Sequence, residues 1–278
     1  MMGAAKAFIS VDAEGLPYVP YKGMLMPGDP LYGEMREIMT RTVLVAVKVL
    51  HDAGFEPITV ADSHGAMVNV DPLRLPGYTV LVRGFPRRLM MVSGAEGSEA
   101  AVFLGYHSSP GLGGVLAHTY SGRIVERVDV AGQDDASEYI LNAYALGELG
   151  VPVILVAGDS TLRGRVEKHT PWAVFIALKE RVSSMADASP GWVEIERSLK
   201  TGIEEAVRRL RSGEAEPLRP PEPWIRIMFK RPWHADIAEL FPCVERLDGL
   251  TVRLGCERFT DNLKLLEGLV IAAYSLER

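Results

Sequence analysis

The 278-residue chain contains 47% hydrophobic and 24% charged residues, a composition typical of globular proteins that bury a core without disulfides or structural metals. Its net charge of -6 argues against nucleic acid as a partner, and no apolar run approaches the roughly 18 residues of a membrane span. Cys243 and Cys256 are too few for a disulfide framework, and the first residues do not form a signal peptide. We therefore expect a cytoplasmic protein without a nucleic-acid or membrane partner.

The first predicted strand, residues 7–11, runs directly into two acidic residues, Asp12 and Glu14. Residues at i and i+2 of an extended chain project from the same face, and Gly15 then allows a sharp turn. Two adjacent carboxylates repel each other unless a cation, a shared proton or solvent relieves the repulsion. The pair is therefore either an exposed acidic strand end or part of a cation site.

A long segment rich in proline and glycine, residues 16–33, follows this motif. Long loops in compact domains are commonly lids, binding loops or contact surfaces, although a plain surface connection is equally compatible with the sequence. Helical spacing of apolar residues then predicts a helix over residues 34–53, which Gly54 ends.

Short apolar runs alternate with helices through the rest of this half of the chain. Further strands are predicted at residues 57–61, 79–82, 101–105 and 151–157, and a helix at about 136–149. This alternation predicts an α/β fold with a largely parallel sheet and helices on both faces.

The sequence changes character after residue 161. An amphipathic helix is predicted at residues 192–211, and residues 214–223 contain four prolines, as a stiff connection would. From residue 224 onward, strands and helices form a small α/β unit. We expect a metal-binding catalytic domain over residues 1–213, the connection at 214–223, and a small C-terminal domain over 224–278.

Residues of types that can bind metals follow three of the predicted strands. Asp12 and Glu14 come after the first strand, His64 after the second, and His107 after the strand at 101–105. Sites in parallel α/β sheets form at the carboxyl ends of the strands, so these side chains are expected at one edge. His118 follows a glycine-rich turn in the same region, whereas His51, His169 and His234 lie outside the pattern.

Glu138, in the first turn of a predicted helix, is the best fifth candidate, although an acid there also complements the helix dipole. Imidazole and carboxylate ligands suit zinc, manganese, iron or cobalt. Five such ligands exceed what one catalytic zinc takes, which favours two metal ions. One carboxylate must then bridge the ions, and Asp12 is central enough to do so.

The same residues make the chain resemble the M55 family of D-aminopeptidases (DppA type) over its whole length. The matching residues are Ser10-x-Asp12-x-Glu14-Gly15, Asp62-Ser63-His64, Gly105-Tyr106-His107, His118, Glu138 with Asn142-Ala143, and Val156-Ala157-Gly158-Asp159. The resemblance implies a dinuclear zinc peptidase in which Asp12, Glu14, His64, His107 and Glu138 bind metal. It also implies that His118 is the unligated catalytic residue and that the subunits form a homodecameric ring.

The expected activity is hydrolysis of N-terminal amide bonds of short peptides with D-amino acids, with two Zn2+ per subunit and Mn2+ or Co2+ as substitutes. His118 acts in this hypothesis as general acid/base or as nucleophile. Asp159 either receives the substrate amine or has a structural role. The alternatives are a hydrolase of L-peptides or small amides with the same site, and a non-catalytic metal-binding assembly protein.

Overall fold

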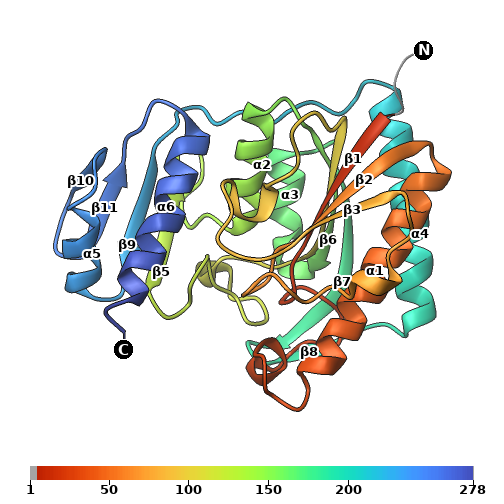
Figure 1. The fold of residues 1–278 in the computed structure, drawn as a ribbon, viewed down its shortest axis with the longest axis horizontal. Helices are drawn as coiled ribbons and strands as arrows, with labels where there is room; N and C mark the ends of the chain where they lie inside the picture. The colour runs from red at the N-terminus through yellow and green to blue at the C-terminus, as the bar shows by residue number, and fades with distance from the viewer. Residues whose placement is uncertain (1–4, 278) are drawn as a thin grey trace.

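The computed structural model describes residues 5–277, which form two sheets with helices around them (Figure 1). The larger sheet has the strand order β3-β2-β1-β4-β6-β7-β8. Its strands are β1 (Ala5–Val11), β2 (Phe55–Asp62), β3 (Thr79–Val82), β4 (Ala100–Tyr106), β6 (Val153–Asp159), β7 (Val174–Ser183) and β8 (Ala186–Ala188). Neighbouring strands are parallel except β7 and β8. The predicted α/β fold with a largely parallel sheet is confirmed.

The central strands are apolar along their whole length because both faces of the sheet are covered. Every residue of β4 and β6 is buried, which is the pattern of parallel strands between two helical layers. In β1, Ser10 pairs with Ala61 of β2 on one side and with Phe103 of β4 on the other. This register aligns the carboxyl ends of the three strands.

Helices cover both faces of the large sheet (Figure 1). The helices α1 (Tyr32–Asp52) and α4 (Trp192–Arg211) share one hydrophobic cluster with the sheet, whereas α2 (Glu138–Glu148) and α3 (Arg163–His169) belong to the other. The expected helices on both faces are thus present. The sequence did not predict α3, because seven residues give too few turns for a clear periodicity.

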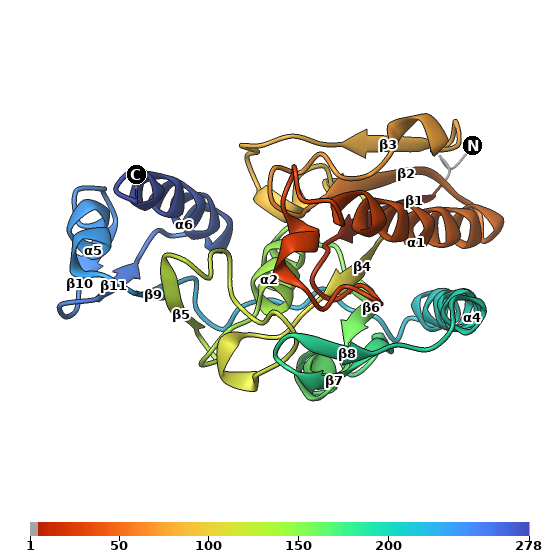
Figure 2. The ribbon, with the colours of Figure 1, turned by 90° about the horizontal axis from the view of Figure 1, so that it is seen from below.

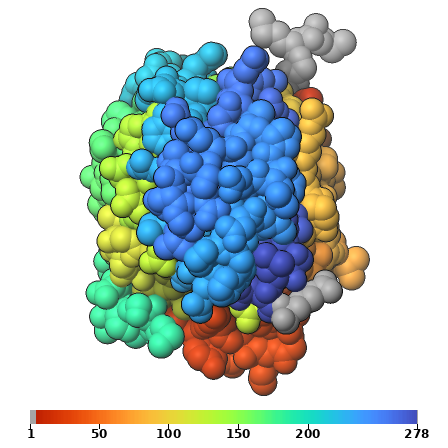
Figure 3. Space-filling model, turned by 90° about the vertical axis from the view of Figure 1, so that its left-hand side faces the viewer, coloured from red at the N-terminus to blue at the C-terminus, as the bar shows by residue number. Residues whose placement is uncertain are grey.

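The second sheet is antiparallel, with the order β10-β11-β9-β5. Its strands are β5 (Val125–Val130), β9 (Ile225–Phe229), β10 (Val244–Arg246) and β11 (Thr251–Leu254), and the helices α5 (Pro232–Ala238) and α6 (Phe259–Tyr274) accompany them. Figure 2 separates this unit from the large sheet, and in Figure 3 its residues, in blue, cover the centre of one face.

The strand β5 was not predicted from the sequence, and it comes from the first half of the chain. Val128 pairs with Ile227 of β9, so main-chain hydrogen bonds tie the first part of the chain to the C-terminal unit. Residues 214–223 contain neither helix nor strand, and the division of the chain at this segment stays a proposal. Among the described residues, no helix combines the length and apolarity needed to cross a bilayer.

Candidate metal centre

The six residues singled out in the sequence lie together at the carboxyl edge of the large sheet. Asp12 and Glu14 follow the end of β1, His64 follows β2, and His107 directly follows β4. Because β1 lies between β2 and β4, the parallel topology brings these three strand ends together. Glu138 joins them as the first residue of α2, and His118 from the loop before β5.

The turn after Asp12 depends on two glycines that let the chain cross the end of β4. The backbone N–H of Gly15 donates to the carbonyl oxygen of Gly105 (2.8 Å). A Cβ at Gly15 would lie 2.0 Å from the carbonyl oxygen of Tyr106, and Gly105 itself has φ +69°. Only glycine fits at both positions, so the turn that holds Asp12 and Glu14 is built into the backbone.

The first group of donors comprises Asp12, Glu14 and His64. Nδ1 of His64 lies 3.0 Å from Oε2 of Glu14 and 3.4 Å from Oδ1 of Asp12. All three side chains are buried, and one potential ligand atom from each lies within 4.8 Å of the others.

The second group comprises His107, His118 and Glu138, whose potential ligand atoms also lie within 4.8 Å of one another. Nε2 of His107 is 3.7 Å from Oε2 of Glu138, and the rings of His107 and His118 stack at 4.5 Å. Nε2 of His118 is 3.8 Å from Oε1 of Glu14, so His118 also faces the first group. Its side chain is 23% exposed, whereas that of His107 is 1% exposed.

Asp12 lies between the two groups. Its Oδ1 faces His64, and its Oδ2 lies 3.5 Å from Nε2 of His107. Both Asp12 Oδ2 and His107 Nε2 are buried and have no hydrogen-bond partner among residues 5–277. Buried polar atoms are normally satisfied, so this orphaned pair fits a bound cation. Carboxylate and neutral imidazole are also the donors that zinc takes.

Backbone carbonyls orient the three histidine rings. Nε2 of His64 donates to the carbonyl oxygen of Leu25 (3.2 Å), Nδ1 of His107 to that of Ser108 (3.0 Å), and Nδ1 of His118 to that of Leu116 (2.9 Å). The opposite nitrogen of each neutral ring then carries its lone pair toward the acids. Such bonds fix the tautomer of histidine ligands.

The buried acids and histidines of the site shift one another's pKa values. Burial, and then the nearby Glu14, raises the pKa of Asp12 to about 8. Burial would lower the pKa of His107, but Glu138 and Asp12 outweigh it and raise this pKa to about 10. Burial would likewise raise the pKa of Glu14, but His64 holds it well below the usual range. In the absence of a metal ion, protonated imidazoles would therefore offset the negative charge of the carboxylates.

A buried hydrogen-bond network lies beneath the donors and joins the elements that carry them. The hydroxyls of Ser10 and Tyr106 are 2.8 Å apart, those of Ser10 and Ser63 2.9 Å, and Nδ2 of Asn142 donates to the Tyr106 hydroxyl (3.0 Å). Ser10 belongs to β1, Tyr106 to β4 and Asn142 to α2, and Ser63 directly follows β2. The network therefore fixes four elements in register below the site.

The loop that carries His118 has a strained backbone. Leu116 and Tyr120 have φ of +54° and +59°, the left-handed region that non-glycine residues rarely adopt. The N–H of Tyr120 donates to Oε1 of Glu138 (2.7 Å), which ties the loop to α2. Strain of this kind persists where the surroundings hold the residue for a function.

A cavity of about 1010 Å³ opens onto both groups of donors. Leu25 and Met26 of the long proline- and glycine-rich loop line it, and the carbonyl oxygen of Leu25 is the partner of His64. From behind, the buried Lys179 donates to the carbonyl oxygen of Val19 (2.9 Å). The loop is thus a wall of the cavity rather than a plain surface connection.

The other candidates named in the sequence have structural contacts. The carboxylate of Asp159 accepts hydrogen bonds from the N–H groups of Val115 (2.7 Å) and Thr161 (2.9 Å), so it holds the backbone. His51 stacks on Tyr78 with 3.8 Å between ring centroids. Two cavity residues that the sequence analysis missed are Tyr120 and Glu267. A signal for Glu267 was its position among the apolar residues of 259–276, whose spacing predicts a final helix.

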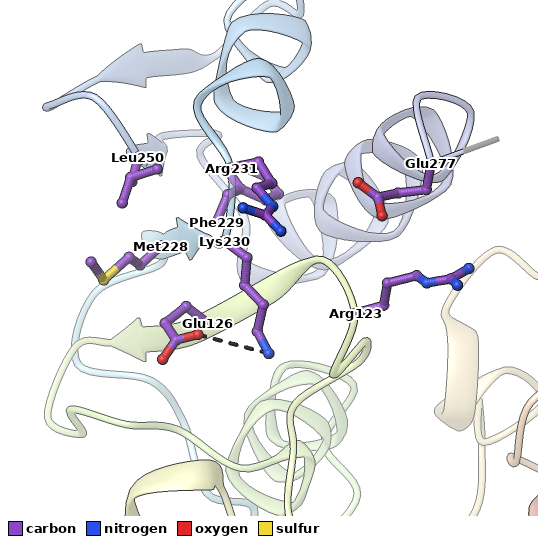
Figure 4. A pocket seen from close by; sticks show the side chains of 8 residues that line it. All are labelled: Arg123, Glu126, Met228, Phe229, Lys230, Arg231, Leu250 and Glu277. Carbon is purple, nitrogen blue, oxygen red and sulfur yellow. Dashed lines mark ion pairs between the residues drawn. The ribbon is translucent and has the colours of Figure 1, made fainter.

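A second hollow of about 570 Å³ lies in the C-terminal unit (Figure 4). Arg123, Lys230 and Arg231 contribute its positive charges, and Lys230 donates to the carbonyl oxygen of Gly122 (2.7 Å). The ammonium of Lys230 also lies 3.8 Å from the carboxylate of Glu126. Within residues 5–277, no group of metal-ligating side chains lies in this hollow. The first cavity is therefore the candidate site.

This chain is similar to known proteins in both sequence and fold. A family model for peptidase M55, described as D-aminopeptidase, matches residues 5–268. The D-aminopeptidase of Bacillus subtilis (strain 168) is 29% identical over 248 residues, which are 88% of this chain and 89% of that protein. The solved structure of the Zn-dependent D-aminopeptidase DppA from Bacillus subtilis, a self-compartmentalizing protease, superposes with a TM-score of 0.89 and 27% identity. The match covers 97% of this chain and 98% of that one.

The fold, the buried donors and these relatives define the class, which is that of the metallopeptidases. Within this class, the chain belongs to the M55 family of D-aminopeptidases. The resemblance found in the sequence is thereby confirmed.

Proposed function

We propose that this protein is an aminopeptidase that cleaves the N-terminal amide bond of short peptides, preferentially those with D-amino acids, at a dinuclear zinc site. The observation that carries the proposal is the position of Asp12 between His64 and His107, with its two oxygens facing different histidines. A carboxylate in this arrangement is suited to bridging two ions. The activities named for the two Bacillus subtilis proteins support the reaction and the metal.

The proposed ligands of the two ions are Asp12, Glu14, His64, His107 and Glu138. Bound zinc supplies a water of lowered pKa and polarises a carbonyl oxygen, and Mn2+ or Co2+ are expected substitutes. Burial excludes water from these donors, and the backbone carbonyls that accept hydrogen bonds from the histidines orient the rings. Nothing in this donor set would favour magnesium or calcium, which prefer oxygen ligands alone.

His118 is proposed as the catalytic residue without a metal. Because Nδ1 donates to Leu116, the lone pair of Nε2 faces the site, where it can take or return a proton. Its greater exposure fits a group that contacts substrate from the cavity side. General acid/base catalysis is the role that this geometry favours, because the ring is already oriented as a proton acceptor.

The test is hydrolysis of matched D- and L-alanyl amides and dipeptides by zinc-loaded and by chelator-treated protein. We expect cleavage only with metal, and faster cleavage of the D series. Preference for the L series would replace the D assignment by an L-peptidase or small-amide hydrolase with the same site. A protein that binds zinc and cleaves none of these substrates would be a metal-binding assembly protein instead.

We further propose a homodecamer in the cytoplasm. The description of the DppA structure as self-compartmentalizing supports an assembly that encloses its sites. Cys243 and Cys256 are both free thiols, which suits a reducing compartment. Sedimentation equilibrium tests the assembly: a species of ten chains is expected, and a monomer at micromolar concentration contradicts it.

A further inference from the structure

One face of α6 forms a wall of the catalytic cavity, although this helix belongs to the C-terminal unit. Glu267, Val270, Ile271 and Tyr274 all line the cavity, and their spacing of three and four residues puts them on one side of the helix. The helix contacts α2, whose first residue is Glu138 (Figure 1). The C-terminal unit therefore contributes to the surface that a substrate meets.

Glu267 is the one acid of this wall. The cavity's other carboxylates, Asp12, Glu14 and Glu138, belong to the donor groups. The side chain of Glu267 is buried, with 5% of the residue exposed. Its only hydrogen bond within residues 5–277 is a long one of 3.4 Å, from the backbone N–H of Arg87 to Oε1.

Glu267 forms no ion pair with any cation of the described chain. The guanidinium of Arg87 donates to the carbonyl oxygen of Val82 (3.0 Å), and its Nε and Nη2 atoms have no hydrogen-bond partner among residues 5–277. Its charge attracts Glu267 without forming an ion pair. Burial raises the pKa of Glu267 even though the N–H and the charge of Arg87 oppose the shift. A buried carboxylate that forms no ion pair is poorly compensated for its lost hydration, so a positive group arriving from the cavity would be stabilised here.

The surroundings of Glu267 suit a cation on an alkyl stem. Val270 and Ile271 flank it on α6, and Met90 and Phe85 line the same cavity. The hydroxyl of Tyr120 is buried without a hydrogen-bond partner among residues 5–277, and burial, followed by the carboxylates of Glu138 and Glu267, raises its pKa. Tyr120 lines the same cavity as Glu267 and Glu138. A lysine-type side chain places its methylene stem on apolar surface and its ammonium on a polar group.

We propose that Glu267 binds a cationic side chain of the substrate and that this enzyme prefers short peptides containing a lysine-type residue. The proposal rests on the proposed peptidase function and adds the substrate class. A purely structural role for Glu267, holding the backbone of Arg87, is the competing explanation. Replacement by glutamine separates the two roles, because the amide oxygen still accepts the Arg87 N–H while the charge is lost.

The experiment compares dipeptides that carry lysine or norleucine, at the first or the second position, with alanine at the other. Norleucine keeps the alkyl stem and lacks the ammonium. For the zinc-loaded enzyme we expect kcat/KM to favour lysine by about tenfold or more at one position, the effect of a hydrogen-bonded charge. In E267Q this preference should fall by about tenfold or more, to a ratio near one. E267D, which keeps the charge, should retain part of it.

The matched control is E257Q, because Glu257 is exposed and takes part in no ion pair of the described chain. This variant should keep the wild-type ratio, and thermal unfolding should show that E267Q is folded. A wild-type enzyme that favours norleucine at both positions, or an equal ratio in E267Q and wild type, overturns the subsite alone. If the zinc-loaded enzyme cleaves no dipeptide, including alanyl-alanine, the peptidase function fails and the subsite with it.

Discussion

Nε2 of His107 lies 3.5 Å from Oδ2 of Asp12, and neither buried atom has a hydrogen-bond partner within residues 5–277. The separation is too long for a strong hydrogen bond and suits two ligands of one ion. The other oxygen of Asp12, Oδ1, lies 3.4 Å from Nδ1 of His64 and also accepts a hydrogen bond from the N–H of Ala13 (2.8 Å). Asp12 is thus the one proposed ligand that would bind both ions.

Replacing Asp12 by alanine should therefore remove more metal than the loss of a terminal ligand would. We expect about two zinc ions per chain in the wild type and less than one in Asp12→Ala, because both ions would share this carboxylate in the proposed site. Metal content after gel filtration, measured by mass spectrometry, checks the prediction, with Glu257→Gln as control. Two ions per chain in Asp12→Ala would show that another residue bridges.

Zinc binding should release protons and strengthen as the pH rises. His64 and His107 are protonated at neutral pH in the metal-free protein, because carboxylates raise the pKa of both and that of His107 reaches about 10. Zinc requires neutral imidazoles, so its affinity should rise roughly tenfold per pH unit for each proton displaced. Calorimetry in buffers of different ionisation enthalpy measures the protons released. A pH-independent affinity between pH 7 and 9 contradicts the charge state described here.

The same shifts predict how the metal-free fold responds to alkali. The pKa of His107 is about 10 in the folded protein and about 6.5 in the unfolded chain, so its stabilising effect is complete below about pH 6.5. The effect is lost as the pH rises through about 10. Urea unfolding with chelator present should give a lower free energy of unfolding at pH 9 than at pH 7. His107→Asn should weaken this dependence.

Removing the His118 side chain should strongly lower the catalytic rate while leaving the metal bound. We expect His118→Ala to lower kcat by about 10²- to 10⁴-fold, the range for a lost general acid or base. Zinc content should equal that of the wild type, because the proposed ligands are untouched. Loss of an ion from His118→Ala would make this residue a ligand, which its place in the second donor group also permits.

The network under the site should tune metal affinity from a distance. Tyr106→Phe removes the hydroxyl that joins Ser10 and Asn142, so we expect zinc affinity to fall about 10- to 100-fold. Stability should fall by about 1–3 kcal/mol, since buried polar partners are left unsatisfied. Zinc competition with a chelator measures the affinity.

Tyr139→Phe is the matched control for this network. Tyr139 follows Glu138 in α2, but its hydroxyl is hydrogen bonded to Thr170 at 2.7 Å and not to the network of Ser10, Tyr106 and Asn142. Its loss should cost comparable stability without changing zinc affinity. Equal effects of both variants on affinity would mean that Tyr106 acts only through general stability.

The sequence by itself determined the parallel sheet and the convergence of Asp12, Glu14, His64 and His107. Both follow from local patterns: a buried strand is a continuous apolar run, and a parallel sheet brings the carboxyl ends of its strands to one edge. The side chains directly after such runs could therefore be placed together without any knowledge of contacts.

Only the tertiary structure decided the pairing of β5 with β9, the hydrogen bond between Tyr106 and Asn142, and the position of Glu267 in the cavity wall. Each depends on contact between residues far apart in the chain, which no local pattern specifies. A tyrosine or a glutamate in an apolar stretch has the same sequence pattern whether it supports a site, contacts a substrate or fills the core. The packing of distant elements against one another determines which of these roles it has.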